Sequence, residues 1–214
     1  MAGASSVLTD DSLLSRLDQR LYTVERLLSL IGGLAVFSLM LLAVVSVAGR
    51  NGFDRPLPGY VDWIEQAMPI IAFVAVSYCQ RDGGHIRMDI LVGQLKGRLL
   101  WIVEFLMIFL MLVLMLLLVW GTWSHFDRSF DWNAPLWSRD SSFDIRLPIW
   151  PAKLVVPVAF AVISARLALQ LVAYGRAIWS GSLTPVAVPL IEDAATVAAK
   201  EAATVSGLEK DDAR

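Results

Sequence analysis

The strongest constraint in this sequence is an uncharged run of 23 residues, Leu27 to Gly49, bounded by Arg26 and Arg50. At about 1.5 Å per residue, a helix of this length crosses a hydrocarbon core of about 30 Å. Lipid offers no hydrogen-bond partners, so a spanning segment must satisfy its backbone internally, as a helix does. The run is also longer than the apolar part of a cleaved secretory leader. It predicts a transmembrane helix at residues 27–49.

Three further apolar stretches predict spans at residues 60–80, 99–122 and 149–172. With 57% hydrophobic residue types and only 18% charged ones, the chain is typical of an integral membrane protein. Lys and Arg are more frequent in the connections that share a side with the two termini, and the positive-inside rule then places both termini in the cytoplasm. We expect an all-α integral membrane fold with four transmembrane helices, comprising a cytoplasmic N-terminal segment (1–26), a four-helix membrane domain (27–175) and a polar cytoplasmic tail (176–214).

Composition excludes several functional classes. A net charge of −2 provides no basic field for nucleic acid. The single cysteine, Cys79, can form neither an intramolecular disulfide nor a cysteine metal cluster. No phosphate-binding loop or HExxH motif is present. We therefore expect no catalytic residue, no metal site and no cofactor.

A few ionisable residues fall inside or at the edges of the predicted spans, where each one needs a partner or contact with water. Matching their heights in the membrane predicts an outer charge cluster and an inner buried pair. These would fix helix register, whereas a proton or ion relay would need carboxylates near the midplane, where none falls. The outer cluster comprises Arg50, Asp62, Glu65 and Lys153, and the inner pair comprises Glu104 and Arg166.

The segment "GGHIRMD" (83–89) connects the second and third spans. Apolar residues at helical spacing follow it, which predicts a short amphipathic helix along the membrane surface. His85, Arg87 and Asp89 then belong either to an ordinary basic loop or to a docking surface. The predicted outer loop, between the third and fourth spans, mixes aromatic and charged residues. It forms either a binding surface or an interfacial cap, and Trp132, Trp137 and Arg139 are its candidate contacts.

Four features in chain order resemble one known family. They are Arg50 at the end of the first span, "PLPGYVDWIEQ" (56–66), "GGHIRMD" and "DIRLPIWPAKLVVPVAF" (144–160). Over residues 25–175 the chain resembles the small membrane subunit, the DctQ-like Q subunit, of tripartite ATP-independent periplasmic (TRAP) transporters. The resemblance assigns His85, Arg87 and Asp89 to the family signature.

This resemblance implies an accessory scaffold subunit, not an enzyme, in a sodium-coupled transporter for organic acids of the bacterial inner membrane. Its partners would be a large TRAP membrane subunit, a periplasmic substrate-binding protein and membrane lipid. The alternative is a four-helix anchor of a redox enzyme that holds haem or quinone through His85 or His125. Those two histidines are expected on opposite sides of the membrane, where they cannot share one iron. A small homo-oligomeric channel is a third option, although no span carries a consistent polar stripe.

Overall fold

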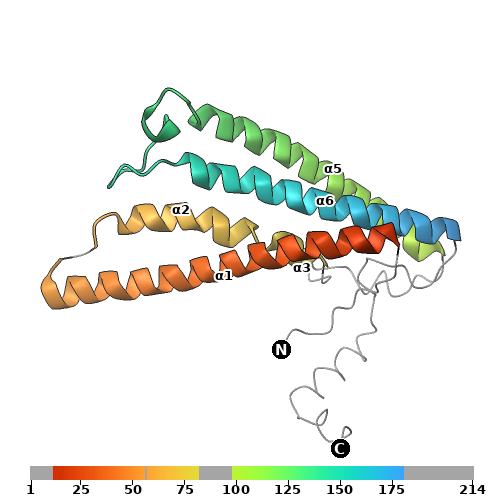
Figure 1. Ribbon diagram of the computed structural model, residues 1–214, viewed down its shortest axis with the longest axis horizontal. Coiled ribbons are helices and arrows are strands. Elements are labelled where there is room, and N and C mark those ends of the chain that lie inside the picture. Colours follow the sequence, from red (N-terminus) through yellow and green to blue (C-terminus); the bar gives the residue numbers. More distant parts are fainter. Residues whose placement is uncertain (1–11, 56, 82–97, 181–214) are drawn as a thin grey trace, which may run out of the picture.

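The computed structural model describes residues 12–55, 57–81 and 98–180 of the 214-residue chain. Within these residues the fold is all-α (Figure 1). Its elements are α1 (Leu13–Phe53), α2 (Tyr60–Phe73), α3 (Val76–Arg81), α5 (Arg98–Ser129), the 3-10 helix η1 (Pro135–Trp137) and α6 (Trp150–Ser180). Helices α1 and α5 run in one direction, and α2, α3 and α6 run in the opposite direction (Figure 1). We call the end where α1 starts and α6 stops the charged end, and the end with the α1–α2 and α5–α6 connections the loop end.

Helix α1 has 41 residues and is far longer than the predicted first span. The Ser12 hydroxyl caps its start by accepting from the Ser15 N–H at 3.2 Å. It ends at Phe53, and the following residue, Asp54, takes the left-handed conformation with φ 52° and donates its N–H to the Gly49 carbonyl. At 1.5 Å per residue α1 is about 60 Å long, roughly twice the hydrocarbon thickness. Residues 13–26, expected as a polar segment before the first span, therefore form the first turns of the helix.

The predicted second span corresponds to two helices, α2 and α3, separated by a turn at Val74 and Ala75. Helix α2 begins after Gly59, which has a φ of 71° that L side chains rarely adopt. A Cβ at this position would also lie 2.7 Å from Cγ1 of Ile145. Glycine is therefore required both by conformation and by the close approach of the α5–α6 loop.

Helix α6 lies at the centre of the fold, packing against α5, α2, α3 and α1, whereas α5 packs mainly against α6. Ile163 and Leu167 of α6 are fully buried, and Tyr174 is almost so. Trp101 and Ile108 of α5 and Leu14 of α1 belong to the same core. The contiguous apolar cluster joins α5 to α6 along the half of the bundle nearer the charged end.

Three helices, α1, α5 and α6, are long and apolar enough to cross a membrane. They contain the predicted first and third spans and all of the fourth except Ile149, and they extend beyond them. A helix continues past the hydrocarbon boundary wherever its polar turns pack. The predicted second span is divided, and neither α2 nor α3 alone has the length of a spanning helix. The predicted interfacial helix and the tail beyond residue 180 lie outside the described residues.

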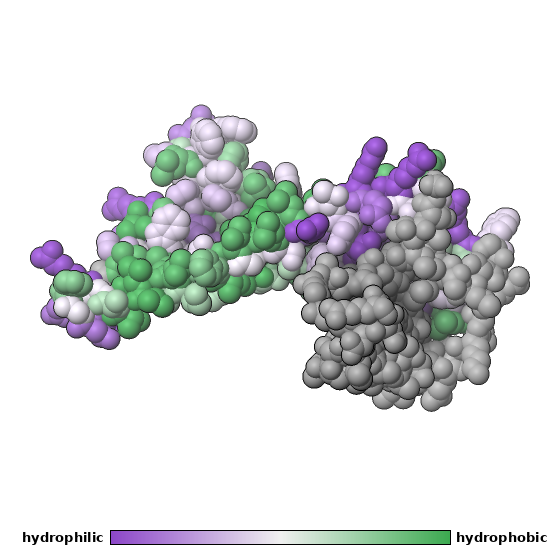
Figure 2. All heavy atoms as spheres, turned by 60° about the horizontal axis from the view of Figure 1, so that its bottom comes forward, coloured by the Kyte–Doolittle hydropathy of each residue, from purple (hydrophilic) through white to green (hydrophobic). Residues whose placement is uncertain are grey.

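Hydrophobic side chains cover the middle of the described helices, and hydrophilic ones lie toward both ends (Figure 2). Most of the apolar window of α1 and of α5 is not buried in the protein. Such continuous apolar faces require lipid or another protein to cover them.

Candidate functional site: two buried polar networks

Four ionisable side chains and a serine meet at the charged end. Arg166 of α6 donates to both carboxylate oxygens of Glu25, at 2.8 Å from Nε to Oε1 and 2.6 Å from Nη2 to Oε2, and its Nη1 donates to Asp18. Arg81 of α3 donates to the other Asp18 oxygen at 3.1 Å. The Ser77 hydroxyl donates to Glu25 at 2.5 Å. All five residues are at most 2% exposed. Two carboxylates and two guanidinium groups neutralise one another in this charged-end network.

Neighbouring side chains extend the charged-end network across the helices. Gln80 of α3 donates to Gln170 of α6 at 3.0 Å. The Arg81 guanidinium lies 4.0 Å from the ring centre of Tyr22, a cation–π contact, and that ring stacks on Tyr78 with centroids 6.1 Å apart. Contacts of this kind fix α1, α3 and α6 in one register, because a shift by one residue would strand a buried charge.

The partners of Arg166 differ from the sequence prediction, which paired it with Glu104. All three guanidinium nitrogens of Arg166 donate to Asp18 and Glu25, while Glu104 is buried on α5. Sequence reasoning missed these two acids because it started the first span at Leu27, after the last charged residue before the apolar run. The available signal was their spacing: seven residues, or about two helical turns, place both carboxylates on one face.

At the loop end, Asp62 in the first turn of α2 binds the loop that precedes α6. Its carboxylate accepts from the Ser142 hydroxyl at 2.7 Å, the Asp144 N–H at 3.1 Å and the Ile145 N–H at 2.7 Å. In return, the Gly59 N–H donates to the Asp144 carboxylate at 2.7 Å. We call this reciprocal arrangement the Asp62 clamp. It satisfies one free N–H at the start of α2 and holds the loop on that helix.

A second loop-end contact joins the start of α6 to the end of α5. Lys153 donates to Asp140 at 2.8 Å and also to the Ser129 hydroxyl, which itself donates to Asp140 at 2.5 Å. The hydrogen bond from Lys153, followed by that from Ser129, holds the pKa of Asp140 below its ordinary value. Asp140 is therefore ionised in neutral solution and anchors the loop to both helices.

The predicted outer cluster is not formed as one group. Asp62 has its partners in the loop and Lys153 has its partner in Asp140, while Arg50 and Glu65 are exposed. The physical reason is that the prediction matched these residues only by their depth along the membrane normal. The rotation of each helix, together with a loop that returns between them, decides which charges meet.

The predicted outer-loop residues lie on an aromatic surface. Trp132 and Trp137 are 74% and 51% exposed, with ring centroids 6.1 Å apart. The ring of Trp137 also packs near that of Trp150, with centroids 6.4 Å apart. Arg139 forms an ion pair with Asp131 at 3.1 Å across the same loop. The loop thus exposes large apolar side chains, and contacts within the loop and with Trp150 hold its backbone in place.

The predicted signature residues His85, Arg87 and Asp89 lie outside the described residues. His125 is exposed on α5, near the loop end. In residues 12–55, 57–81 and 98–180, no group of three or more His, Cys, Asp or Glu side chains could hold a metal ion. At both ends the polar groups described above contact other groups of this chain.

Comparison with protein families identifies the chain. Residues 39–174 match the family of the DctQ component of tripartite ATP-independent periplasmic transporters. The chain belongs to the DctQ family. No curated protein matches the sequence.

Membership in the DctQ family confirms the resemblance seen in the motifs. It makes this chain a membrane component of a TRAP transporter, and the three long apolar helices agree with a multi-pass membrane protein. The family is a transporter component and not an enzyme family. The alternative of a redox anchor receives no support from the match.

Proposed function

We propose that this DctQ component is the accessory scaffold subunit of a sodium-coupled TRAP transporter for organic acids. In this proposal the chain crosses the bacterial inner membrane four times, with α2 and α3 together forming the second crossing and both termini in the cytoplasm. It docks the large membrane subunit and the periplasmic substrate-binding protein. The family match, which covers residues 39–174, supports the assignment to a TRAP complex.

The observation that carries the scaffold role is where the charges lie. Sites for cargo and coupling ions in secondary transporters are found near the bilayer midplane. Here, the charged groups lie toward the two ends of the bundle. Those of the charged-end network pair with one another, and Asp62 of the clamp is held by the α5–α6 loop. The middle of α1, from Leu27 to Gly49, carries no charge. A chain built in this way holds helices in register and leaves transport to its partner.

The exposed apolar faces of α1 and α5 supply area for docking the large subunit. Along α5, exposed residues recur at helical spacing through Leu106, Leu110, Leu114 and Leu117, which are 53% to 59% exposed. Helix α5 is held mainly by α6, so the opposite side of α5 is open for a partner. Association of helices in lipid depends on close packing over such faces.

The loop end supplies a second surface, which we assign to the binding protein. Trp132, Leu136 and Phe143 are 74%, 69% and 102% exposed. Tryptophan is enriched among the hot-spot residues that contribute most of the binding free energy in protein interfaces. The loop carries these side chains on a backbone held by the Asp62 clamp and by Lys153, which limits the entropy lost on docking.

The test is affinity purification of the tagged chain from membranes in mild detergent. A large polytopic protein should copurify with it. Replacing Trp132 with Ala should weaken retention of the binding protein about tenfold, the effect of a residue worth more than 1 kcal/mol. The matched control is Trp179→Ala, which changes a 93% exposed tryptophan at the charged end. Purification of the chain alone contradicts the scaffold role, and a larger loss from Trp179→Ala would place the binding protein at the charged end.

A further inference from the structure

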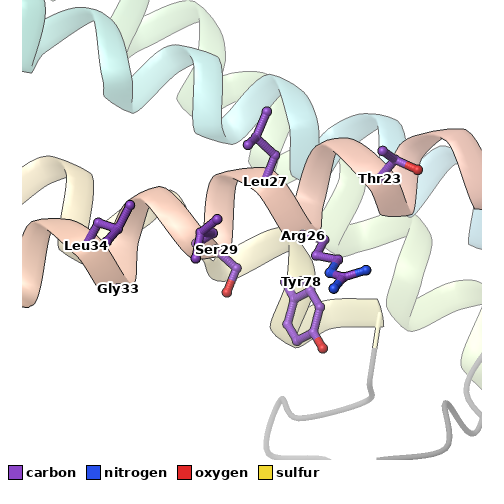
Figure 3. A pocket seen from close by; sticks show the side chains of 8 residues that line it. Thr23, Arg26, Leu27, Ser29, Gly33, Leu34 and Tyr78 are labelled. Atoms are coloured by element: carbon purple, nitrogen blue, oxygen red, sulfur yellow. The ribbon is translucent and has the colours of Figure 1, made fainter. Parts of the chain in front are cut away.

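An open groove of about 700 Å³ follows the first helix near the charged end. It is lined by Thr23, Arg26, Leu27, Ser29, Leu30, Gly33 and Leu34 of α1 and by Tyr78 of α3 (Figure 3). Apart from Ser29, the α1 residues follow an i, i+3, i+4, i+7 pattern and share one helix face. Neither the charged-end network nor the Asp62 clamp uses this face.

The groove is polar at one end and apolar along its length. Thr23, Arg26 and Tyr78 lie at the end nearer the start of α1, and Leu27, Leu30 and Leu34 continue from it toward the middle of the helix. From residue 26 to residue 34 the helix rises about 12 Å, which is part of the length of an acyl chain in one leaflet. A Cβ added at Gly33 would meet no atom within 4 Å, so the groove is open at this point.

Arg26 occupies the boundary between charge and hydrocarbon. It is the last charged residue before the uncharged run that begins at Leu27. Its side chain is exposed, and in the described parts of the chain it has no hydrogen-bond or ion-pair partner. The adjacent Glu25 points the other way and is fully buried against Arg166. Within the described residues, Arg26 therefore presents a positive charge without an acidic partner, at the boundary where lipid headgroups meet hydrocarbon.

Tyr78 is held at the same end by the charged-end network. Its ring stacks on Tyr22, whose other contact is the buried Arg81 guanidinium. Arg26 and Tyr78 project from α1 and α3 at one end of the groove (Figure 3). The Arg26 guanidinium is the groove's donor for phosphate oxygens. The Thr23 hydroxyl donates to the Gln19 carbonyl at 3.1 Å.

We propose that this groove binds an anionic phospholipid, with its phosphate at Arg26 and one acyl chain against Leu27, Leu30 and Leu34. Charge complementarity selects the anionic headgroup, and the apolar wall selects a lipid over a free phosphate. The site belongs to this chain alone and does not depend on the scaffold role.

The test uses the full chain purified in detergent, titrated with phosphatidylglycerol or with phosphatidylcholine of the same acyl chains, and read out by native mass spectrometry. We expect phosphatidylglycerol to bind more tightly. Arg26→Gln should reduce that affinity about fivefold, the effect of about 1 kcal/mol per basic residue at a lipid surface. Arg50→Gln, which changes an exposed arginine at the other end of α1, should have no effect on it.

A second variant tests the acyl-chain part of the groove. Gly33→Leu fills the open space and should reduce binding of both lipids, while Gly121→Leu, at another open position on α5, should not. Inorganic phosphate should not displace the bound lipid. Equal affinities for the two lipids, or full phosphatidylglycerol affinity in Arg26→Gln, would overturn the site. An Arg26→Gln variant that keeps its lipid but loses its large partner would assign the groove to that protein instead.

Discussion

Replacing Glu25 with glutamine tests the central feature of the fold. The substitution keeps the shape of the side chain but removes one negative charge from a buried, neutral set of four. Arg166 then retains a single anionic partner, Asp18, which it shares with Arg81. The variant therefore buries one positive charge that no carboxylate compensates.

The size of the effect follows from the geometry. Glu25 accepts two hydrogen bonds from Arg166, at 2.8 and 2.6 Å, and both side chains are fully buried. Removing one member of a buried ion pair costs about 3 to 5 kcal/mol. For a chain of this length, 1 kcal/mol corresponds to about 2 to 4 °C in Tm. We expect Glu25→Gln to lower Tm by roughly 6 to 20 °C.

The assay is thermal unfolding in one detergent, followed by tryptophan fluorescence, with Glu65→Gln as the matched control. Glu65 is an exposed carboxylate on α2, so its loss should change Tm by no more than about 2 °C. Arg166→Met should be as harmful as Glu25→Gln. The double variant should be more stable than either single one, because Asp18 and Arg81 then remain as a balanced pair.

Two results would refute this reasoning. If Glu25→Gln and Glu65→Gln have the same Tm, the charged-end network does not stabilise the fold. A double-mutant cycle separates the two possible partners of Arg166. If the coupling energy between Glu104 and Arg166 exceeds that between Glu25 and Arg166, then the sequence-based pair was the right one.

Three further outcomes concern the loop end. Gly59→Ala should lower the free energy of unfolding by about 1 to 2 kcal/mol, seen as a fall in Tm, because it forces a left-handed alanine against Ile145. Asp62→Ala should speed hydrogen exchange at the Ile145 amide, whereas Asp62→Asn, which keeps one acceptor, should speed it less. The pKa of Asp140 is lowered from 3.8 in the fold, so its ion pair with Lys153 stabilises the loop above that value and the contribution is lost as the pH falls through the lowered pKa. Tryptophan fluorescence should therefore change only well below about pH 5, and in Lys153→Met the change should begin at higher pH.

Hydropathy predicted where the long helices lie, because lipid requires continuous apolar residues and tolerates few exceptions. It did not predict where helix α1 starts. The turns before Leu27 carry Asp18 and Glu25, which look like a solvated segment until Arg81 and Arg166 are placed beside them. Long-range pairs of this kind depend on helix rotation and crossing, which a one-dimensional pattern does not contain.

The loop end shows why the family motifs were informative while the contacts stayed hidden. "PLPGYVDWIEQ" contains Gly59 and Asp62, and "DIRLPIWPAKLVVPVAF" contains Asp144 and Ile145. These two motifs, about 80 residues apart, form the two sides of the Asp62 clamp. Sequence reasoning found both but assigned Asp62 to the wrong partners, because a loop that returns onto a helix start has no periodicity. Left-handed backbone at Arg146, a residue type that rarely adopts it, was equally invisible.

The order of the chain gives the charged-end network a consequence for biosynthesis. Asp18 and Glu25 leave the ribosome first, Arg81 follows, and Arg166 is made only when the last crossing is nearly complete. Until then the network has two carboxylates and, in Arg81, one guanidinium. Insertion of the final helix therefore supplies the second guanidinium that the network needs. A nascent chain stopped before residue 166 would leave Glu25 without its Arg166 partner and accessible to water or to quality-control proteases.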